Sequence, residues 1–248
     1  MLLDTDTDPS AVDLTMAKEI GLKLDSHAVP ASGGGTSKNV AYETKVALIN
    51  VGTLETKNVE AGAIDLSTVS TQLGKKIDGV LGYSFLKNRI VQIDYPAKVV
   101  RFFDKPPYSG SPPSSHNITV LSFHYSDYVM IDGVSVNGQV FTATLDTGSS
   151  GNFHLTPEAV SKLGLDEEAA KGPISGSVGY NGNAQHHSGT VNNILIGDIS
   201  VDKPNVTFFT KGTGHDKKPW GLNIGNVFLK GYVVTVDYRA KKITLEKP

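Results

Sequence analysis

The 248-residue sequence lacks several features that would point to common protein classes. It has no cysteine, which excludes disulfide bonds and thiolate metal sites. No apolar run approaches the roughly 20 residues that a transmembrane helix needs, and no signal-peptide pattern follows Met1. The formal net charge is −2, so the basic surface that nucleic acids or acidic membranes attract is absent. We expect a soluble protein without a nucleic-acid partner, and the compartment stays open.

What the sequence does contain favours strands joined by turns. It has 26 glycines together with many valine, isoleucine and threonine residues, a composition typical of β proteins. Helix signals are short: Asp13 and Thr156 each stand where a helix N-cap is preferred, and Gly21 and Gly164 follow where each helix would end. We expect only a few short helices.

The most informative stretch ends a predicted strand at Asp146. Residues 139–145 are mostly apolar, and Asp146 is followed by Thr147, Gly148, Ser149 and Ser150. A carboxylate at the end of a buried strand requires hydrogen-bond donors, which hydroxyls and a tightly turning glycine backbone can supply. Taken alone, the stretch is equally well interpreted as an Asx turn that closes a hairpin.

A second copy of this pattern lies near the N-terminus. The chain there contains Asp4-Thr5-Asp6-Thr7, and later landmarks recur in the second half at a constant separation of 143 positions. The matching pairs are Gly21 and Gly164, Gly82 and Gly225, and Asp94 and Asp237. Three blocks in one register indicate an internal duplication and therefore two domains.

The duplicated pattern resembles the retropepsin-like aspartic peptidases. In that family each half supplies an Asp-Thr/Ser-Gly loop and, later, an apolar-apolar-Gly segment before a short helix. Residues 146–148 and 223–225 match in the second half, and Val80-Leu81-Gly82 matches in the first. The resemblance covers nearly the whole chain, as two such units joined like a pepsin-type pseudodimer.

The resemblance implies an all-β acid-protease fold. Two similar β-barrel-like lobes would be related by a pseudo-two-fold axis with the cleft between them, and each lobe would carry a short helix or two. We expect the lobes at residues 1–104 (the first half) and 116–248 (the second half). The segment 105–115, rich in proline and serine, is expected to be the linker.

The family resemblance also implies the chemistry. Asp4 and Asp146 would share a proton and activate a water molecule that hydrolyses a peptide bond, with no metal or organic cofactor. Thr5 and Thr147 would cross-brace the two loops, and Gly148 would allow their close approach. The hydroxyls of Thr7 and Ser149 would hydrogen-bond the outer carboxylate oxygens. The substrate would be a peptide or protein.

The first half departs from the family pattern in two ways. Asp6 stands where the motif has glycine, and a further carboxylate there is expected to raise the pKa of the aspartate pair. The second half also has a predicted hairpin before its aspartate, with an Asn137-Gly138 turn between residues 128–136 and 139–146. No such hairpin precedes Asp4, so we expect that it is missing, and any export signal would belong to the missing part.

The glycine-rich interval 172–189 corresponds to the flap, the hairpin that closes over substrate in this family. Tyr180 is our candidate flap aromatic residue, and an ordinary flexible loop is the alternative. A similar glycine-rich stretch in the first half spans residues 30–35. His186 and His187 have no further ligand at a spacing suited to a metal, and Asp94 and Asp237 are interpreted as turn residues.

Three functional hypotheses follow. The favoured one is a monomeric, single-chain aspartic endopeptidase that uses Asp4 and Asp146. The second is a catalytically impaired homologue that binds extended peptides in the same cleft. The third is a homodimer in which two second halves pair their Asp146 residues.

Overall fold

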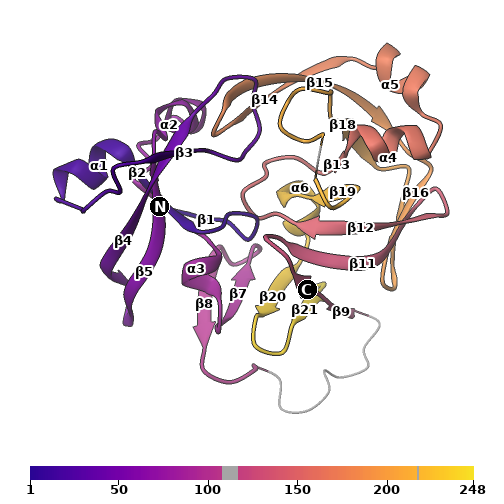
Figure 1. Cartoon of the computed structure of the whole chain (residues 1–248). Helices are drawn as coiled ribbons and strands as arrows, with labels where there is room; N and C mark the ends of the chain where they lie inside the picture. Colours follow the sequence, from indigo (N-terminus) through magenta and orange to yellow (C-terminus); the bar gives the residue numbers. More distant parts are fainter. Residues whose placement is uncertain (108–116, 217) are drawn as a thin grey trace.

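The computed structural model describes residues 1–107, 117–216 and 218–248, and it is built mainly of strands (Figure 1). Within these ranges the strands form three sheets, which confirms the predicted all-β class. The segment expected to be the linker lies largely outside the described residues. Among the described residues, no helix combines the length and apolar character needed to cross a membrane.

The first sheet contains only strands of the first half. Its order is β1 (Leu2–Leu3), β6 (Gly79–Leu81), β2 (Ser10–Asp13), β5 (Leu54–Ile64), β4 (Val40–Val51) and β3 (Ala28–Pro30). Strands β4 and β5 pair along a long antiparallel hairpin. Many of the side chains on this hairpin are exposed, which weakens the hydrophobic alternation that marks a strand.

The second sheet contains ten strands, all from the second half. Its order is β14 (Ile174–Gly179), β15 (Gly182–Thr190), β18 (Asn205–Phe208), β13 (Phe153–Leu155), β19 (Leu222–Ile224), β12 (Gln139–Leu145), β11 (Val129–Val136), β16 (Asn193–Ile196) and β17 (Ile199–Asp202), with β10 (His124–Tyr125) beside β11. The predicted β11–β12 hairpin is present. Asn137 and Gly138 both have positive φ (50° and 83°), as a tight two-residue turn requires.

The third sheet joins the two halves. Its order is β8 (Val99–Phe103), β7 (Ile90–Asp94), β20 (Val233–Asp237), β21 (Lys242–Glu246) and β9 (Ile118–Ser122), along the lower side in Figure 1. Gln92 of the first half pairs with Thr235 of the second, its own counterpart in the 143-residue repeat, and the side chains hydrogen-bond at 3.1 Å. Equivalent residues therefore meet at the pseudo-two-fold axis.

The described residues contain six short helices, three in each half rather than the one or two expected. They are α1 (Leu14–Glu19), α2 (Ser67–Leu73), α3 (Tyr83–Leu86), α4 (Pro157–Lys162), α5 (Asp166–Lys171) and α6 (Asn226–Leu229). Asp13 and Thr156 cap α1 and α4 as predicted, by accepting backbone N–H bonds. The sequence missed α2 and α5 because neither has a side-chain N-cap and each is too short to show a helical period.

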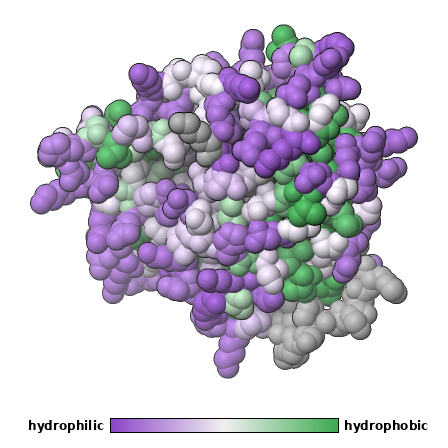
Figure 2. All heavy atoms as spheres, turned by 45° about the vertical axis from the view of Figure 1, so that its right-hand side comes forward, coloured by the Kyte–Doolittle hydropathy of each residue, from purple (hydrophilic) through white to green (hydrophobic). Residues whose placement is uncertain are grey.

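The hydrophobic core is concentrated in the second half. Its largest cluster includes Phe153, Ile194 and Leu222, and it extends into the shared sheet through residues of the first half such as Val91 of β7. The first half alone contributes two small clusters, one of them around Leu66. The space-filling view shows a mostly hydrophilic surface, with apolar atoms gathered chiefly on the side that the second half forms (Figure 2).

The two halves repeat one local arrangement that delivers an aspartate. Leu3 of β1 pairs in parallel with Leu81 of β6, and Leu145 of β12 pairs in parallel with Ile224 of β19. The next backbone N–H, of Asp4 or Asp146, then donates to the carbonyl of Leu81 or Ile224, at 3.0 Å in each case. Both aspartates therefore begin equivalent loops at the ends of equivalent strands.

Candidate active site

The two aspartate loops are hydrogen-bonded to each other. The backbone N–H of Thr5 donates to Thr147 Oγ1 and that of Thr147 donates to Thr5 Oγ1, both at 3.1 Å. The Thr147 hydroxyl also donates to the Leu3 carbonyl at 3.0 Å. Both threonines are buried, so each hydroxyl needs these partners. The structure thus places Thr5 and Thr147 between the two loops, where each accepts a hydrogen bond from the other loop.

Asp146 accepts three hydrogen bonds. The backbone N–H groups of Gly148 and Ser149 each donate to its Oδ1 at 2.8 Å, and Asn223 Nδ2 donates to its Oδ2 at 2.7 Å. The expectation for the Ser149 hydroxyl is corrected: it accepts from the Gly151 N–H at 3.3 Å, and Asn223 takes its place on the outer oxygen. A polar residue between the buried Leu222 and Ile224 was the available sequence signal for this role.

Asp4 is bound differently. Its Oδ1 accepts the Asp6 N–H at 2.8 Å, and its Oδ2 accepts the Thr7 hydroxyl at 2.7 Å. The carboxyl group lies directly against Gly148 of the other loop, since a Cβ added at Gly148 would stand 2.3 Å from Asp4 Oδ2. Only glycine leaves room for Asp4 at this position.

Burial and mutual repulsion favour the protonated forms of these carboxyl groups. Burial, followed by the charge of Asp146, raises the pKa of Asp4 to about 7, against the opposing hydrogen bonds from Thr7 and Asp6. Burial also raises the pKa of Asp146, but the hydrogen bonds from Asn223, Ser149 and Gly148 oppose it. Donors aimed at a carboxylate favour its ionised form, so of the two, Asp146 is the better placed to carry the charge.

Asp6, at the position of the motif glycine, adds a third carboxyl group to the site. Its Oδ1 accepts the Thr144 hydroxyl of β12 at 2.7 Å. Burial and the charges of Asp146 and Asp4 raise its pKa well above the ordinary value, while the Thr144 bond and the positive charge of Lys218 lower it. The structure therefore accommodates a side chain here by turning it toward the second half, where a hydroxyl binds it.

Tyr180 lies at the tip of the β14–β15 hairpin, which forms in the interval where a flap or a flexible loop was expected. The hairpin arches from the second half toward the first (Figure 1). The Tyr180 hydroxyl lies 3.0 Å from Thr7 Oγ1. Because the only hydrogen of the Thr7 hydroxyl goes to Asp4, Tyr180 donates to Thr7. The hairpin tip is thereby connected to the Asp4 carboxyl.

Glycines of the first half receive this hairpin tip. Asn181 N–H donates to the Gly34 carbonyl at 2.9 Å, and Ser37 N–H donates to the Asn181 carbonyl at 2.8 Å. A Cβ added at Gly35 would lie 2.1 Å from the Asn181 carbonyl oxygen, and one at Gly33 would lie 3.1 Å from the Tyr180 side chain. The glycine-rich stretch is therefore the surface on which the hairpin of the opposite half rests.

The remaining sequence candidates lie apart from the aspartates. His186 Nε2 is 2.8 Å from Ser177 Oγ, and His187 Nδ1 is 2.9 Å from the Gly172 carbonyl oxygen. Asp94 and Asp237 each bind backbone N–H groups of their own turns, as expected. In the described parts of the chain, no group of three or more His, Asp or Glu side chains is arranged to hold a metal ion.

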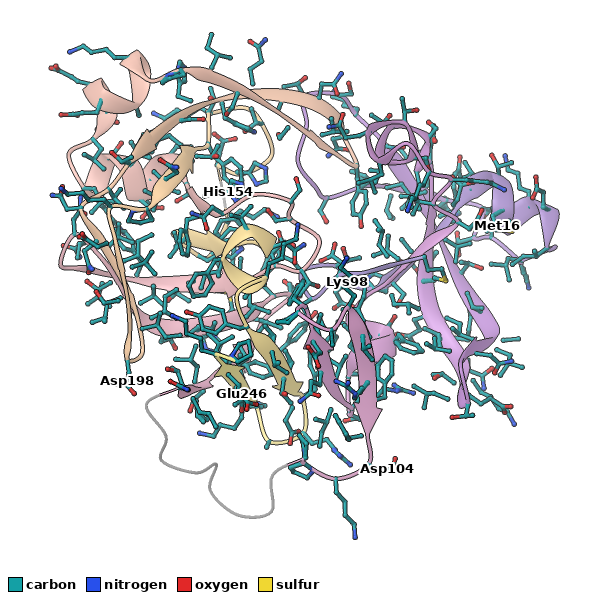
Figure 3. The ribbon with its side chains drawn as sticks, turned by 180° about the vertical axis from the view of Figure 1, so that it is seen from behind. Met16, Lys98, Asp104, His154, Asp198 and Glu246 are labelled. Atoms are coloured by element: carbon teal, nitrogen blue, oxygen red, sulfur yellow. The ribbon has the colours of Figure 1, made fainter. Side chains whose placement is uncertain are left out.

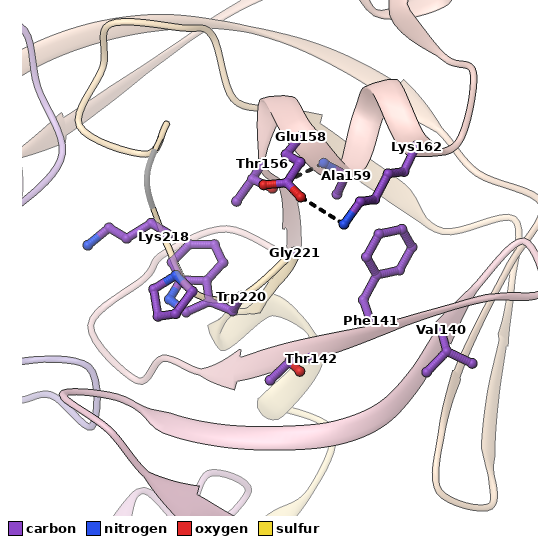
Figure 4. A pocket seen from close by; sticks show the side chains of 11 residues that line it. Val140, Phe141, Thr142, Thr156, Glu158, Ala159, Lys162, Lys218, Trp220 and Gly221 are labelled. Atoms are coloured by element: carbon purple, nitrogen blue, oxygen red, sulfur yellow. Dashed lines mark hydrogen bonds and ion pairs between the residues drawn. The ribbon is translucent and has the colours of Figure 1, made fainter.

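A pocket elsewhere in the second half lies between α4 and β12 (Figure 4). Glu158 and Lys162 form an ion pair of 2.7 Å at its rim, and Thr156 is occupied in capping α4. None of the residues of the two aspartate loops lines it. The pocket therefore presents no carboxyl pair or activated nucleophile of its own.

Comparison with known proteins identifies a matching family and a group of similar solved structures. The model of a family described as aspartyl protease matches residues 1–85 and 133–224, and each matched segment contains one aspartate loop. A retropepsin-like aspartic protease from Rickettsia conorii is similar over 52% of this chain and 90% of its own, with 18% identity and a TM-score of 0.41. Comparison with curated proteins gave no match. Because the family model matches more than half of the residues, the chain belongs to the aspartyl protease family.

Proposed function

We propose that the chain is a single-chain aspartic endopeptidase that activates water between Asp4 and Asp146. The observation that carries the proposal is the reciprocal bonding of Thr5 and Thr147, which holds the two loops together with the Asp4 carboxyl against Gly148. The lobes are residues 1–104 and 116–248, joined by the linker 105–115. Family membership supports the coarser activity, an aspartic protease.

The two carboxyl groups take different roles. Asp146 is the base, because three donors stabilise its ionised form, and Asp4 is the acid, because its pKa of about 7 keeps a proton on it in acid solution. Asp146 removes a proton from the bound water while the protonated Asp4 donates a hydrogen bond to the scissile carbonyl oxygen. The water oxygen attacks the carbonyl carbon and Asp4 gives its proton to the carbonyl oxygen, which yields a neutral tetrahedral diol.

Collapse of the diol completes the cycle. The proton held by Asp146 passes to the leaving amine nitrogen as the C–N bond breaks, and one hydroxyl proton of the diol returns to Asp4. The products are a carboxylic acid and an amine, and the pair again holds one proton. Since the two groups interact at close range, the pH dependence belongs to the pair.

The substrate class is a peptide or protein segment bound in extended form beneath the β14–β15 hairpin. The tip of this hairpin is bonded to residues 34–39 of the first half, so these bonds must break for a substrate to enter. A strand-like peptide can replace them with main-chain hydrogen bonds of its own. We therefore expect cleavage of flexible segments and not of folded domains.

The interlocked halves favour one chain as the active unit. The shared third sheet and the Thr5–Thr147 bonds both connect the first half of the chain to its second half. A homodimer that pairs two Asp146 residues would have to break the latter contacts. The monomer is therefore preferred to the homodimer.

Cleavage of a mixed peptide library between pH 3 and 8 tests the proposal. Asp4→Asn and Asp146→Asn should each lower the rate by at least about 10²-fold. Asp94→Asn and Asp237→Asn are matched controls, because these aspartates are also duplicated but bind only within or beside their own turns. Both controls should retain cleavage.

Other outcomes distinguish the alternatives. Folded wild-type protein that binds peptides at every pH without cleaving them would establish the peptide-binding homologue. Cleavage that survives Asp4→Asn, with an activity per molecule that rises with protein concentration, would establish pairing of two second halves. Either result overturns the single-chain mechanism.

A further inference from the structure

The side-chain amide of Asn223, which donates to Asp146, also contacts a histidine, His154. His154 of β13 and Asn223 of β19 are directly opposed in antiparallel register, so their side chains share one face of the sheet. His154 Nδ1 lies 3.1 Å from Asn223 Oδ1, and Asn223 Nδ2 lies 2.7 Å from Asp146 Oδ2. The three side chains form a continuous chain that runs into the site from behind. Figure 3 shows His154 toward the interior of the second half.

The direction of these bonds is determined by what each group can donate. An ionised carboxylate only accepts, so Asn223 must turn its NH₂ group toward Asp146 and its carbonyl oxygen toward His154. That oxygen needs a donor, which requires His154 to carry a hydrogen on Nδ1. If His154 lacked this hydrogen, its Nδ1 would attract the Asn223 NH₂ group, and the amide would be drawn to rotate its oxygen toward Asp146.

The surroundings hold His154 in place. Its ring stacks on Phe209 with a centroid distance of 4.9 Å and an interplanar angle of 1°. Its Nε2 lies against Gly151, where an added Cβ would come within 2.2 Å of that nitrogen. Burial lowers the pKa of His154, while the bond to Asn223 opposes that effect. The neutral ring is therefore favoured, and it keeps a donor on one nitrogen only.

The first half has no counterpart to this chain. The residues at the same register positions are Ala11 and Val80, which are also directly opposed across two antiparallel strands. Asp4 instead receives the hydroxyl of Thr7, whose single hydrogen can rotate toward another acceptor. The polar pair therefore makes the two aspartates unequal, although their loops are alike.

We propose that His154 is a positioning residue that holds the Asn223 NH₂ group toward Asp146 and so makes Asp146, rather than Asp4, the base of the reaction. This role rests on the proposed function, because it assigns the two aspartates of that mechanism. It requires no contact between His154 and the substrate. Its signature is a change in the protonation of Asp146.

The test compares three variants by kcat, KM and the pH dependence of kcat/KM. Asn223→Val gives the second half the residue of the first, and His154→Leu removes the donor. Both should lower kcat about 10- to 100-fold with KM nearly unchanged, and should move the acid limb of the profile upward by about one pH unit. His154→Asn should keep most of the wild-type kcat and the wild-type position of the acid limb, because its NH₂ group can replace the Nδ1 donor.

The other titratable side chains near Asp146 and His154 must be the same in all variants, so that a shift of the acid limb can be assigned to the substituted residue. Asp4, Asp6 and Lys218 face Asp146, and His186 and His215 lie near His154; all are retained in the three variants. His186→Asn is the comparison variant. Its ring also packs against Phe209, at 4.9 Å, but it bonds Ser177, so the acid limb should keep its wild-type position.

Nitrogen NMR of the histidine rings supplies a second readout that needs no variant to fold. The wild-type protein should show His154 protonated on Nδ1, and protonation on Nε2 alone would overturn the proposal. The proposal would also be overturned if His154→Leu and His154→Asn had the same kcat and pH profile, or if neither Asn223→Val nor His154→Leu shifted the acid limb. Either result would leave the proposed peptidase function intact. Absence of any wild-type cleavage would instead refute the proposed function, and this role with it.

Discussion

Thr5 and Thr147 form a reciprocal pair of hydrogen bonds across the boundary between the two halves. Each backbone N–H donates to the hydroxyl oxygen of the other residue at 3.1 Å, and both side chains are buried. The two residues are 142 positions apart in the chain, yet they occupy equivalent places in the repeat. Their bonds therefore link the stability of the fold to the geometry of the candidate site.

Thr5→Val and Thr147→Val should each reduce the free energy of unfolding by about 1–3 kcal/mol, because each removes one hydroxyl and leaves a buried N–H of the other loop without a partner. Urea unfolding measures the loss. The cost of the double variant should differ from the sum of the two single variants by about 0.5 kcal/mol or more, because the two residues are in direct contact within one hydrogen-bond network. Thr53→Val, in the exposed β4–β5 turn, is the control and should change little. Strict additivity would contradict the pairing.

Stability should fall as the pH rises from about 4 to about 8. The pKa of Asp4 is raised to about 7 in the folded protein, so the folded state holds a proton that the unfolded state has already lost. This contribution is present in full below pH 4 and disappears as Asp4 ionises. Asp4→Asn should therefore match the wild type near pH 3 and exceed its unfolding free energy by a few kcal/mol at pH 8. A difference that is constant with pH would contradict the raised pKa.

Asp6→Asn should leave the acid limb of the cleavage pH profile unchanged. Burial and the charges of Asp146 and Asp4 raise the pKa of Asp6 well above its usual range, so Asp6 stays protonated and uncharged while that limb titrates. The asparagine keeps an acceptor for the Thr144 hydroxyl, so packing should be preserved. The measurement is kcat/KM from pH 3 to 8. An acid limb displaced toward lower pH would contradict this prediction, because it would show that Asp6 is ionised there and repels the charge of the aspartate pair.

Gly35→Ala should separate the β14–β15 hairpin from the first half. The new Cβ would collide with the Asn181 carbonyl, and the φ of +123° is unfavourable for alanine. Hydrogen exchange of residues 174–190 should become faster, while the strands of the core keep their protection. Gly176→Ala in β14 is the control, because its Cβ would meet nothing closer than 4.0 Å. Equal exchange in both variants would show that residues 31–39 do not hold the hairpin.

The sequence predicted the parts of the site that depend on local repetition. The constant separation of 143 residues identified equivalent loops, and the structure pairs Gln92 with Thr235 across the pseudo-two-fold axis. The sequence also predicted the β11–β12 hairpin and the caps of α1 and α4, because a turn or a cap depends on a few neighbouring residues. Helices α2 and α5 were missed because they have no side-chain cap and only one or two turns.

The different hydrogen-bond donors of the two aspartates were not predicted from the sequence. Asn223 reaches Asp146 because β19 lies between β12 and β13, and His154 contacts Asn223 across an antiparallel ladder. The glycine sequence at 33–35 also did not predict that the β14–β15 hairpin of the other half packs on these residues. Each of these contacts joins residues that are distant along the chain, so no local pattern encodes it.

By itself, then, the sequence determined the β class, the duplication and the two aspartate loops, because composition, repeat spacing and turn residues are local properties of the chain. Only the tertiary structure decided which donors reach each carboxyl group, where the Asp6 side chain turns and what covers the site. Those outcomes depend on the register of paired strands and on the packing of one half against the other, where a shift of a single residue would change every partner.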